Sequence, residues 1–174
     1  MPLRDGSGSV VRVFKIAVDI TADKRAEAMN MARLAAAEAC FAVIEFTTTG
    51  EILYANENFL AATGYRFEEI KGKHHRIFVE PAYAQSAEYA DFWARLQAAE
   101  SFTGEFKRVR KDGQPVWIRA IYSPVKDHKG KIERVVKYAV DITAEKLGAE
   151  RRASLQKQLH ERLTAVEGAV RNAD

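Results

Sequence analysis

Hydrophobic and polar residues follow different periods in successive parts of the chain, and each change of period predicts a new element. Residues 22–39 are rich in Ala, Met, Glu, Lys and Arg and contain no Gly or Pro, a composition that favours a helix. From residue 41 the pattern changes to two short β-prone runs, 41–47 and 51–55, with turn residues between them. This pattern predicts a hairpin directly after the helix.

The middle of the chain carries helical signals in short pieces. Asn56 is a favoured N-cap residue and predicts a helix over 57–63, which Gly64 ends. About one further helical turn is expected over 66–71. A proline at the start, and apolar spacing after it, predict one longer helix over 81–99.

Strand-like alternation returns after residue 101. Residues 102–110, 115–125 and 131–140 are β-prone, and turns that contain Gly separate them. Two sets of hairpin-type strands on either side of a helical insert predict an α+β fold with an antiparallel sheet.

A helix is expected again over residues 144–174. Leu159, Leu163, Val166 and Val170 follow one another at the spacing of a short a/d seam. A seam of this length favours a dimeric coiled coil, with an ordinary amphipathic helix as the alternative.

One short sequence occurs twice, about one domain length apart. Residues 12–24 (RVFKIAVDITADK) are echoed at 134–146 (RVVKYAVDITAEK). In both copies an apolar run ends at Asp-Ile-Thr and gives way to a charged, Ala-rich helical stretch. We therefore interpret residues 1–21 as the tail strand of a preceding module or as a duplicated connector, and residues 22–39 as a linker helix.

Composition narrows the classes of function. The 174 residues suffice for one compact domain with flanking helices. The 27 basic and 24 acidic residues are interspersed and give a net charge of only +3, which argues against nucleic-acid binding. The single cysteine, Cys40, excludes an intrachain disulfide and fits a reducing compartment. No apolar stretch approaches the roughly 20 residues that cross a bilayer, so we expect a cytoplasmic segment without membrane contact.

Motifs of common enzyme classes are absent from the sequence. It contains no Gly-rich phosphate loop, no nucleophile elbow and no His-Glu-x-x-His pattern. Acidic pairs such as Glu68-Glu69 lie on expected helix surfaces. We therefore expect a binding or regulatory role and no catalysis.

Several short motifs occur in a fixed order between residues 50 and 143. They are Gly50–Phe59 (GEILYANENF), Thr63-Gly64-Tyr65, Glu68–Gly72 (EEIKG), Gly104-Glu105-Phe106, Lys111-Asp112-Gly113, Val116-Trp117-Ile118 and Asp141-Ile142-Thr143. In this order they resemble the PAS sensor domain family. The segment at 72–81 (GKHHRIFVEP) is most similar to PAS modules of soluble methyl-accepting chemotaxis receptors of the aerotaxis-like kind. Such modules often occur in tandem.

The resemblance implies an α+β PAS fold over residues 40–143. In this fold a five-stranded antiparallel sheet and short helices on one of its faces enclose a pocket, and signalling helices flank the domain. The flanking helices would be 22–39 and 144–174. The five strands would be 41–47, 51–55, 102–110, 115–125 and 131–140.

The resemblance also implies a function. The chain would be the sensory input domain of a bacterial cytoplasmic chemoreceptor, which binds a cofactor or small ligand and relays its state through the C-terminal helix. The implied partners are a second copy, joined through the flanking helices, and the chemotaxis kinase and coupling protein of a full-length receptor. Two alternatives stay open: a ligand-free PAS dimerisation or interaction module, and the sensor half of a histidine kinase or cyclic-di-nucleotide enzyme.

FAD and haem b are the candidate cofactors, beside a domain that holds none. Trp93 matches the position of a Trp in the flavin site of aerotaxis receptors, although residues 78–81 depart from the flavin-binding pattern. Packing of Trp93 against the sheet is the alternative. His74 or His75 would be the haem ligand, because imidazole is a common axial donor. The alternative is a pair in a basic loop that is solvated or forms local hydrogen bonds, and no other metal site is expected.

Asn58, Trp117 and Tyr138 complete the candidate cofactor-binding residues. Asn58 flanks the first short helix of the domain, where it would donate to a ligand. Trp117 and Tyr122 differ in parity along one strand, so they face opposite sides of the sheet. Either of these two would line the pocket.

The candidate signal-relay residues lie where strand becomes helix in the two copies of the repeat. They are Asp141 and Thr143 in the second copy and Asp19 and Thr21 in the first. We expect Thr143 to cap the C-terminal helix and Asp141 to hold the helix to the domain body. An ordinary N-cap without a role in signalling is the alternative.

Overall fold

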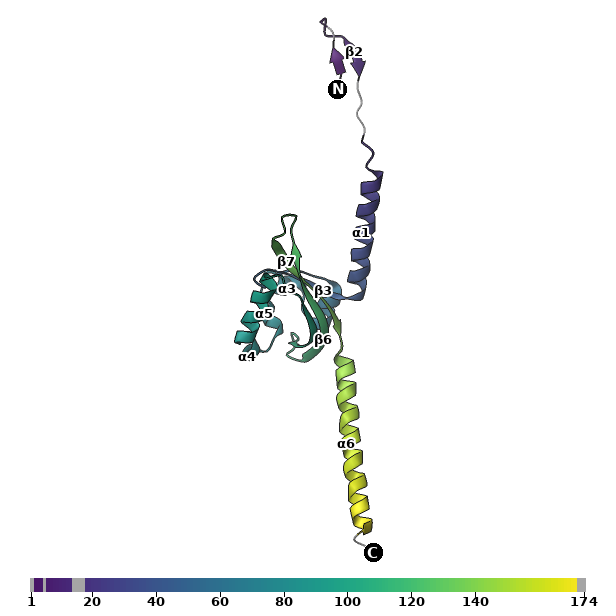
Figure 1. Ribbon diagram of the computed structural model, residues 1–174, viewed down its shortest axis with the longest axis vertical. Helices are drawn as coiled ribbons and strands as arrows, with labels where there is room; N and C mark the ends of the chain where they lie inside the picture. Colours follow the sequence, from purple (N-terminus) through teal and green to yellow (C-terminus); the bar gives the residue numbers. More distant parts are fainter. Residues whose placement is uncertain (1, 5, 14–17, 172–174) are drawn as a thin grey trace. The chain divides into compact units, whose positions relative to one another are not determined.

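A computed structural model describes residues 2–4, 6–13 and 18–171 of the chain (Figure 1). The chain divides into two compact units, one that ends at Ala37 and one that begins at Glu38. The first unit holds two short strands and most of one helix. The second unit holds a sheet, its covering helices and the C-terminal helix.

In the first unit, strands β1 (Pro2–Arg4) and β2 (Val10–Val13) pair antiparallel and form a two-stranded sheet of their own. Helix α1 (Thr21–Cys40) begins at the threonine of the repeated sequence, and none of its side chains is buried. The predicted tail strand includes residues 14–17, which lie outside the described residues.

The second unit is built on one five-stranded antiparallel sheet, which confirms the predicted α+β fold. The strands lie in the order β4-β3-β7-β6-β5, so β7 runs through the centre of the sheet between β3 and β6. The strands are β3 (Ala42–Thr47), β4 (Ile52–Ala55), β5 (Phe102–Val109), β6 (Pro115–Lys126) and β7 (Ile132–Asp141). The strand that leads to the C-terminal helix is therefore the most enclosed strand.

Short helices fill the connection from β4 to β5. They are α2 (Glu57–Thr63), α3 (Phe67–Ile70), the 3-10 helix η1 (His75–Phe78), α4 (Pro81–Ala84) and α5 (Ala87–Gln97). The Asn56 side chain accepts a hydrogen bond from the Phe59 backbone N–H and caps α2 as predicted. Gly64 ends α2 with a φ of 75°, a left-handed conformation that favours glycine. The helices pack their apolar sides on one face of the sheet.

The prediction of a single helix over 81–99 is wrong. The structure has two helices there, α4 and α5, separated by Gln85 and Ser86. The Ser86 hydroxyl accepts a hydrogen bond from the Tyr89 backbone N–H at 3.1 Å and so caps α5. Serine favours such a start because its oxygen satisfies an N–H that has no partner within the helix. The new start gives α5 its own buried face, which includes Trp93.

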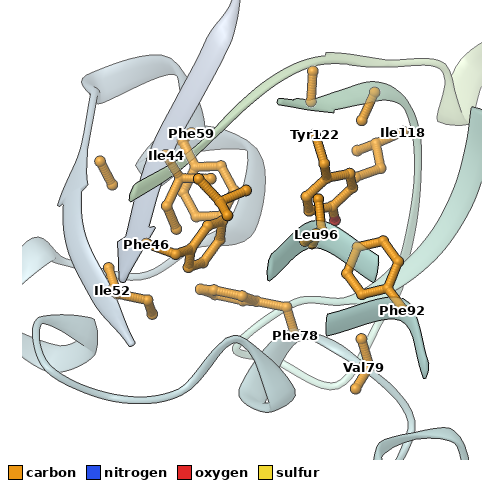
Figure 2. Close-up of a cluster of buried hydrophobic side chains, with 14 of the residues drawn as sticks. Ile44, Phe46, Ile52, Phe59, Phe78, Val79, Phe92, Leu96, Ile118 and Tyr122 are labelled. Carbon is orange, nitrogen blue, oxygen red and sulfur yellow. The ribbon is translucent and has the colours of Figure 1, made fainter. Parts of the chain in front are cut away.

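The hydrophobic core lies between the inner face of the sheet and the short helices (Figure 2). Aromatic side chains from several elements meet in it: Phe46 of β3, Phe59 of α2, Phe92 of α5 and Tyr122 of β6. Alternate residues of a strand face the same side of a sheet, so the register decides which side chains enter the core. Tyr122 pairs with Lys137 across β6 and β7, and the core therefore receives a lysine.

Helix α6 (Thr143–Arg171) follows β7 with one residue between them. Leu159 and Leu163 of the predicted seam are 60% and 53% exposed. Val166 and Val170 lie outside the residues whose side chains the structure describes, so the coiled coil stays a prediction. Neither α6 nor any other helix in the described part of the chain is long and apolar enough to cross a membrane.

Candidate functional site

His75 lies at the centre of a buried polar cluster on the inner face of the sheet. It belongs to η1, and none of its surface is exposed. Its Nδ1 atom lies 2.9 Å from Oη of Tyr89 in α5, and its Nε2 atom lies 3.1 Å from Oη of Tyr122 in β6. The Tyr89 ring stacks on the imidazole with 15° between the two planes. Both ring nitrogens of His75 therefore have a phenol partner.

The imidazole of His75 is neutral near pH 7. Burial, reinforced by the positive charges of Arg108 and Lys137, lowers the pKa of His75 well below its ordinary value. Burial also raises the pKa of Tyr89 to about 12, so that phenol keeps its proton. One ring nitrogen of the neutral imidazole donates a hydrogen bond and the other accepts one.

Two cationic side chains lie beside this cluster in the core. Arg108 at the end of β5 is 6% exposed and Lys137 of β7 is 2% exposed. Nη2 of Arg108 donates to Oη of Tyr122 at 3.2 Å, while its Nε has no hydrogen-bond partner among the described residues. Nζ of Lys137 lies 5.0 Å from the ring centre of Tyr122 and 5.5 Å from that of Phe59. The core thus holds two cations surrounded by aromatic rings.

The cations also act on the acidity of Tyr122. Burial alone would raise the pKa of the Tyr122 hydroxyl, but Arg108 and Lys137 together outweigh burial and lower that pKa below its ordinary value. Burial lowers the pKa of Lys137, and Tyr122 opposes this effect. The charges of Arg108, Lys137 and Tyr122 therefore affect one another.

A small, partly open cavity adjoins the two cations. Its volume is about 20 Å³, enough for about one water molecule. Phenylalanine rings and small apolar side chains form most of its wall. The residues that line it include Phe59, Thr63, Phe78, Arg108, Lys137 and Asp141.

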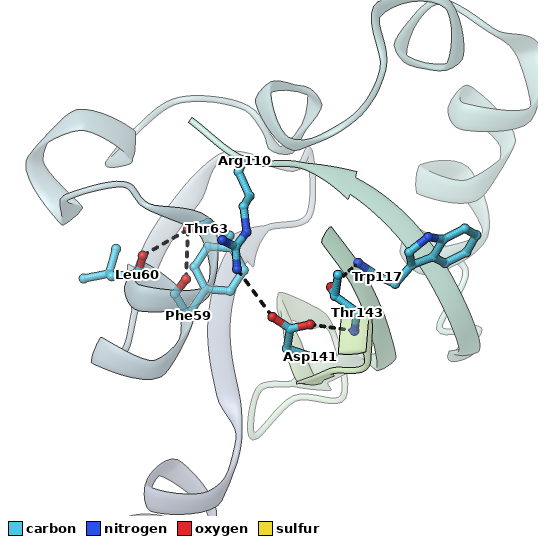
Figure 3. Close-up of polar contacts among 7 residues, drawn as sticks. All are labelled: Phe59, Leu60, Thr63, Arg110, Trp117, Asp141 and Thr143. Carbon is cyan, nitrogen blue, oxygen red and sulfur yellow. Dashed lines mark hydrogen bonds and ion pairs between the residues drawn. The ribbon is translucent and has the colours of Figure 1, made fainter. Parts of the chain in front are cut away.

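The C-terminal joint, residues 141–146, attaches α6 to the sheet (Figure 3). Oδ1 of Asp141 accepts a hydrogen bond from the Thr143 backbone N–H at 2.8 Å, and Oδ2 lies 3.5 Å from Nη2 of Arg110. Oγ1 of Thr143 accepts from the Trp117 backbone N–H at 2.9 Å. This arrangement differs from the expected division of roles: Asp141 binds the first turn of α6 as well as the domain, and Thr143 binds β6.

Charged side chains around the C-terminal joint add further contacts between α6 and the sheet. Glu105 of β5 forms ion pairs with Lys146 of α6 and with Arg119 of β6, and Arg119 also lies 3.3 Å from Glu145. Hydrogen bonds from Lys146 and Arg119 lower the pKa of Glu105. Because these groups are on the surface, each pair contributes little alone.

The N-terminal joint, residues 19–24, has the same local structure. Oδ1 of Asp19 accepts from the Thr21 backbone N–H at 2.9 Å. The Lys24 N–H donates to the Ile20 carbonyl at 3.0 Å, as the corresponding N–H of Lys146 does within the C-terminal joint. The repeated sequence therefore encodes one local helix start, used twice.

A family comparison assigns the domain that carries this site. The model of the PAS fold family matches residues 52–139, about half of the chain. The chain belongs to the PAS fold family. The match includes His75, Arg108, Tyr122 and Lys137, and it ends just before the C-terminal joint. The PAS sensor domain predicted from the motifs is thereby confirmed.

Relatives of the chemoreceptor kind share this PAS domain. Biofilm dispersion protein BdlA of Pseudomonas aeruginosa is 45% identical over 142 residues, which are 82% of this chain and 34% of that protein. The aerotaxis receptor of Escherichia coli is 32% identical over 98 residues, 56% of this chain and 19% of the receptor. The chain thus spans about a third or less of the length of these relatives.

A solved structure supports the fold. A light-oxygen-voltage domain studied with a flavin analogue superposes with a TM-score of 0.55 at 21% identity. The superposition covers 75% of this chain and 98% of that domain. At this level of sequence identity, the similarity shows a shared fold and nothing more.

Two of the predicted cofactor residues border the buried cluster of the PAS domain. Trp93 is 6% exposed, and its ring lies edge-on to that of Phe46 with 5.6 Å between the centres. His74 is half-buried, and its Nδ1 accepts from the Arg76 backbone N–H at 3.1 Å, which caps η1. Of the alternative, solvation is wrong for His75, because the 3-10 turn directs that side chain into the core, whereas His74 does form a local hydrogen bond.

The other predicted cofactor residues lie elsewhere. Asn58 is exposed and donates hydrogen bonds to the carbonyls of Glu38 and Phe41. Trp117 and Tyr138 are partly buried on the outer face of the sheet, one residue out of phase with the inward positions of β6 and β7. This placement differs from the expectation that they line the interior pocket. Tyr122 is the residue of β6 that faces inward.

The packed interior does not fit a flavin or a haem. Ligand pockets for groups of this size have volumes of about 300 Å³ or more, whereas the cavity holds about 20 Å³. Both nitrogens of His75 are bonded to phenols, so His75 could bind haem iron only if one of these hydrogen bonds broke.

The sequence contained a signal for the residues that were not singled out. Phe102, Gly104, Phe106 and Arg108 share one parity in β5, which places the arginine on the side of the two aromatic residues. Lys137 stands between inward residues of β7 in the same way. A charged residue on an otherwise apolar strand face therefore indicates a buried charge in this domain.

Proposed function

We propose that this PAS domain is the sensory input module of a signalling protein, and that it relays the state of its interior to α6. One observation carries the proposal: the buried cluster and the C-terminal joint share the same two strands. Tyr122 and Trp117 both belong to β6, and Lys137 lies four residues before Asp141 in β7. A change in the packing of the cluster therefore acts directly on the strands that hold α6.

The relay follows from linkage. A ligand shifts an equilibrium only by its difference in affinity between two arrangements of the protein. A ligand that contacts β6 or β7 from the inside favours one position of these strands. Because Thr143 is bonded to β6 and Asp141 to Arg110, the residue just after β5, each position of β7 favours a different placement of the first turn of α6. The helix then reports ligand binding.

The relatives support a chemoreceptor as the parent protein. We infer a bacterial cytoplasmic chemoreceptor that acts as a homodimer through the flanking helices α1 and α6. The exposed Leu159 and Leu163 of α6 support such pairing. The chemotaxis kinase and the coupling protein are then the partners of the full-length receptor. The sensor half of a histidine kinase is the nearest alternative parent.

The packed interior favours a small ligand over a large cofactor. The similarity to the aerotaxis receptor and to the flavin-analogue structure keeps FAD as a candidate cofactor. The buried His75 keeps haem b as a candidate. Either group would require the aromatic cluster to open widely, whereas a ligand of a few atoms requires only a small expansion of the cavity of about 20 Å³. The same packing also favours a second candidate function, a ligand-free PAS interaction module.

Two measurements on freshly purified protein, expressed with flavin and haem precursors, separate these candidates. The first is its absorption spectrum, in which flavin and haem have distinct bands. The second is native mass spectrometry, which weighs any bound small molecule. The proposal predicts a colourless protein that holds a small ligand. A flavin or haem spectrum would overturn the small-ligand assignment. If the protein is colourless, holds no ligand and is stabilised by no small molecule, the ligand-free interaction module is the remaining candidate function.

A further inference from the structure

We propose that the interior cavity beside Arg108 and Lys137 binds the carboxylate or phosphate group of an anionic ligand. The inference rests on the proposed sensory function and adds the chemical class of the ligand. It is based on the burial of the two cations, the unused Nε donor of Arg108 and the position of Asp141 at the same cavity.

The two cations are buried without an acidic partner. Burial of a charge is costly unless an opposite charge or several hydrogen bonds compensate it. Among the described residues, neither Arg108 nor Lys137 forms an ion pair with a carboxylate, although both are at least nine-tenths buried. The exposed Lys107, by contrast, pairs with Glu80 at 2.9 Å. The acidic partner is thus missing where it would contribute most.

The hydrogen-bond donors of Arg108 are also incompletely used. Its Nη1 donates to the Lys107 carbonyl at 2.9 Å and its Nη2 to Oη of Tyr122 at 3.2 Å, while Nε has no acceptor among the described residues. A guanidinium presents its donors in a planar fork that matches a carboxylate or a phosphate. An anion at the cavity would accept hydrogen bonds that the protein leaves unmade.

The cavity suits the charged end of a small molecule. Apolar rings such as Phe59 and Phe78 line it, and the low dielectric of such walls strengthens the attraction between an anion and the cations. Its volume of about 20 Å³ holds about one water molecule, so a carboxylate or phosphate group enters with a shift of the side chains around the cavity. Thr63 does not compete as a donor there, since its hydroxyl donates to the Phe59 carbonyl at 2.8 Å.

Asp141 provides the connection to the output helix. It lines the same cavity, and its carboxylate is engaged by Arg110 and by the Thr143 N–H. An anion between the two buried cations brings a second negative charge close to this carboxylate. The repulsion favours a different position of Asp141, and Asp141 binds the first turn of α6. Anion binding is therefore coupled to the helix start by charge as well as by the strands.

The test is a thermal-unfolding titration of the full chain. Acetate, inorganic phosphate and FAD are added separately, with ionic strength held constant by a bulky sulfonate salt. We compare the wild type with Lys137→Met, which removes the charge at similar volume, and with Arg108→Gln as a second variant. Lys131→Met removes an exposed lysine and is the matched control.

At least one anion should raise the melting temperature of the wild type in a saturable way. The affinity should fall about tenfold or more in Lys137→Met and Arg108→Gln, the expected effect of a lost charged hydrogen bond, and should not change in Lys131→Met. Without anion, Lys137→Met should melt at or above the wild-type temperature, because an unpaired buried charge has been removed.

The arms of the experiment identify the source of the anionic group. A response to acetate or phosphate indicates a free small anion. A response to FAD alone that requires Lys137 indicates the phosphate of a cofactor and would show that the packed interior opens to admit it. The absence of any response in the wild type, or an equal response in Lys137→Met, would overturn the inference. An anion that binds without changing hydrogen exchange in α6 would keep the inference and contradict the proposed relay.

Discussion

The two joints of this chain have the same sequence and the same local hydrogen bonds, yet only one of them is attached to a sheet in the described structure. Asp19 and Asp141 each accept from the N–H of the threonine two residues later. Ile20 of the N-terminal joint is 52% exposed, whereas Ile142 of the C-terminal joint is 1% exposed and donates its N–H to the Trp117 carbonyl at 2.8 Å. The hydrogen bonds that begin each helix are local in sequence, whereas the attachment of the C-terminal joint to the sheet depends on tertiary contacts.

This difference separates two roles that the Asp-Ile-Thr sequence combines. The aspartate and the threonine N–H suffice to begin a helix wherever the sequence stands. Transmission needs further partners, which β6 supplies through Trp117 and β5 supplies through Glu105. The comparison predicts that equivalent substitutions in the two joints have unequal effects, and the following tests are ordered by expected size.

The largest difference is expected for the isoleucines. Ile142→Ala should lower the free energy of unfolding of the PAS domain by about 2–4 kcal/mol, because it leaves a cavity in a packed site. Ile20→Ala should change it by less than about 0.5 kcal/mol, as is usual for exposed positions. Urea unfolding followed by tryptophan fluorescence measures both. Equal losses in the two variants would show that the first joint is also packed.

The threonine hydroxyls should differ next. Thr143→Val leaves the Trp117 N–H without its acceptor and should cost about 1–2 kcal/mol in the same unfolding experiment. Thr143→Ser keeps the oxygen and is the control, which should retain most of the stability. Thr21→Val should have little effect. If Thr143→Ser were as harmful as Thr143→Val, the methyl group and not the hydrogen bond would matter.

A smaller effect is expected from the charges around the C-terminal joint. Lys146 and Arg119 lower the pKa of Glu105, so the stabilisation is present above the unfolded-state pKa and is lost as the pH falls through the lowered value. Acidification, or Glu105→Gln at neutral pH, should therefore speed amide exchange in the first turn of α6. Added salt should reduce the difference between Glu105→Gln and the wild type. A difference that salt leaves unchanged would point to packing instead of charge.

The smallest effect concerns the N-terminal cap. Hydrogen bonds from the Thr21 hydroxyl and N–H lower the pKa of Asp19 from its ordinary value of 3.8. The cap should consequently persist above the ordinary Asp pKa and be lost only as the pH falls through the lowered value. The pH dependence of the Thr21 amide signal in NMR measures this directly. A midpoint at or above 3.8 would contradict the cap.

Most of the fold follows from local sequence signals. Asn56 is typical of the start of a helix and Gly64 of its end, and together they predict the bounds of α2. The alternation of apolar and polar residues in the later segments predicts the ends of the strands to within about two residues. The break before α5 was missed because Ser86 lies inside a run with helical spacing, where a capping serine and an ordinary helical residue have the same sequence pattern.

The candidate site was harder to predict than the fold. Its members come from η1, α5, β5, β6 and β7, and only the register of β6 and β7 brings Lys137 opposite Tyr122. A lysine in a strand usually indicates the solvent face, so the inward side chain contradicts the common rule. The joints were found because they repeat, and the partner of Thr143 could not be read from its neighbours in the sequence.

The central claim is that the state of the interior reaches α6 through the C-terminal joint. Amide hydrogen exchange at residues 143–148 and 21–26 tests it in the wild type and in Lys137→Met, each with and without Asp141→Ala. The account predicts that Lys137→Met changes exchange at 143–148 and leaves 21–26 unchanged, and that Asp141→Ala abolishes this response. An unchanged first turn of α6, or a response that persists without the Asp141 carboxylate, would contradict it.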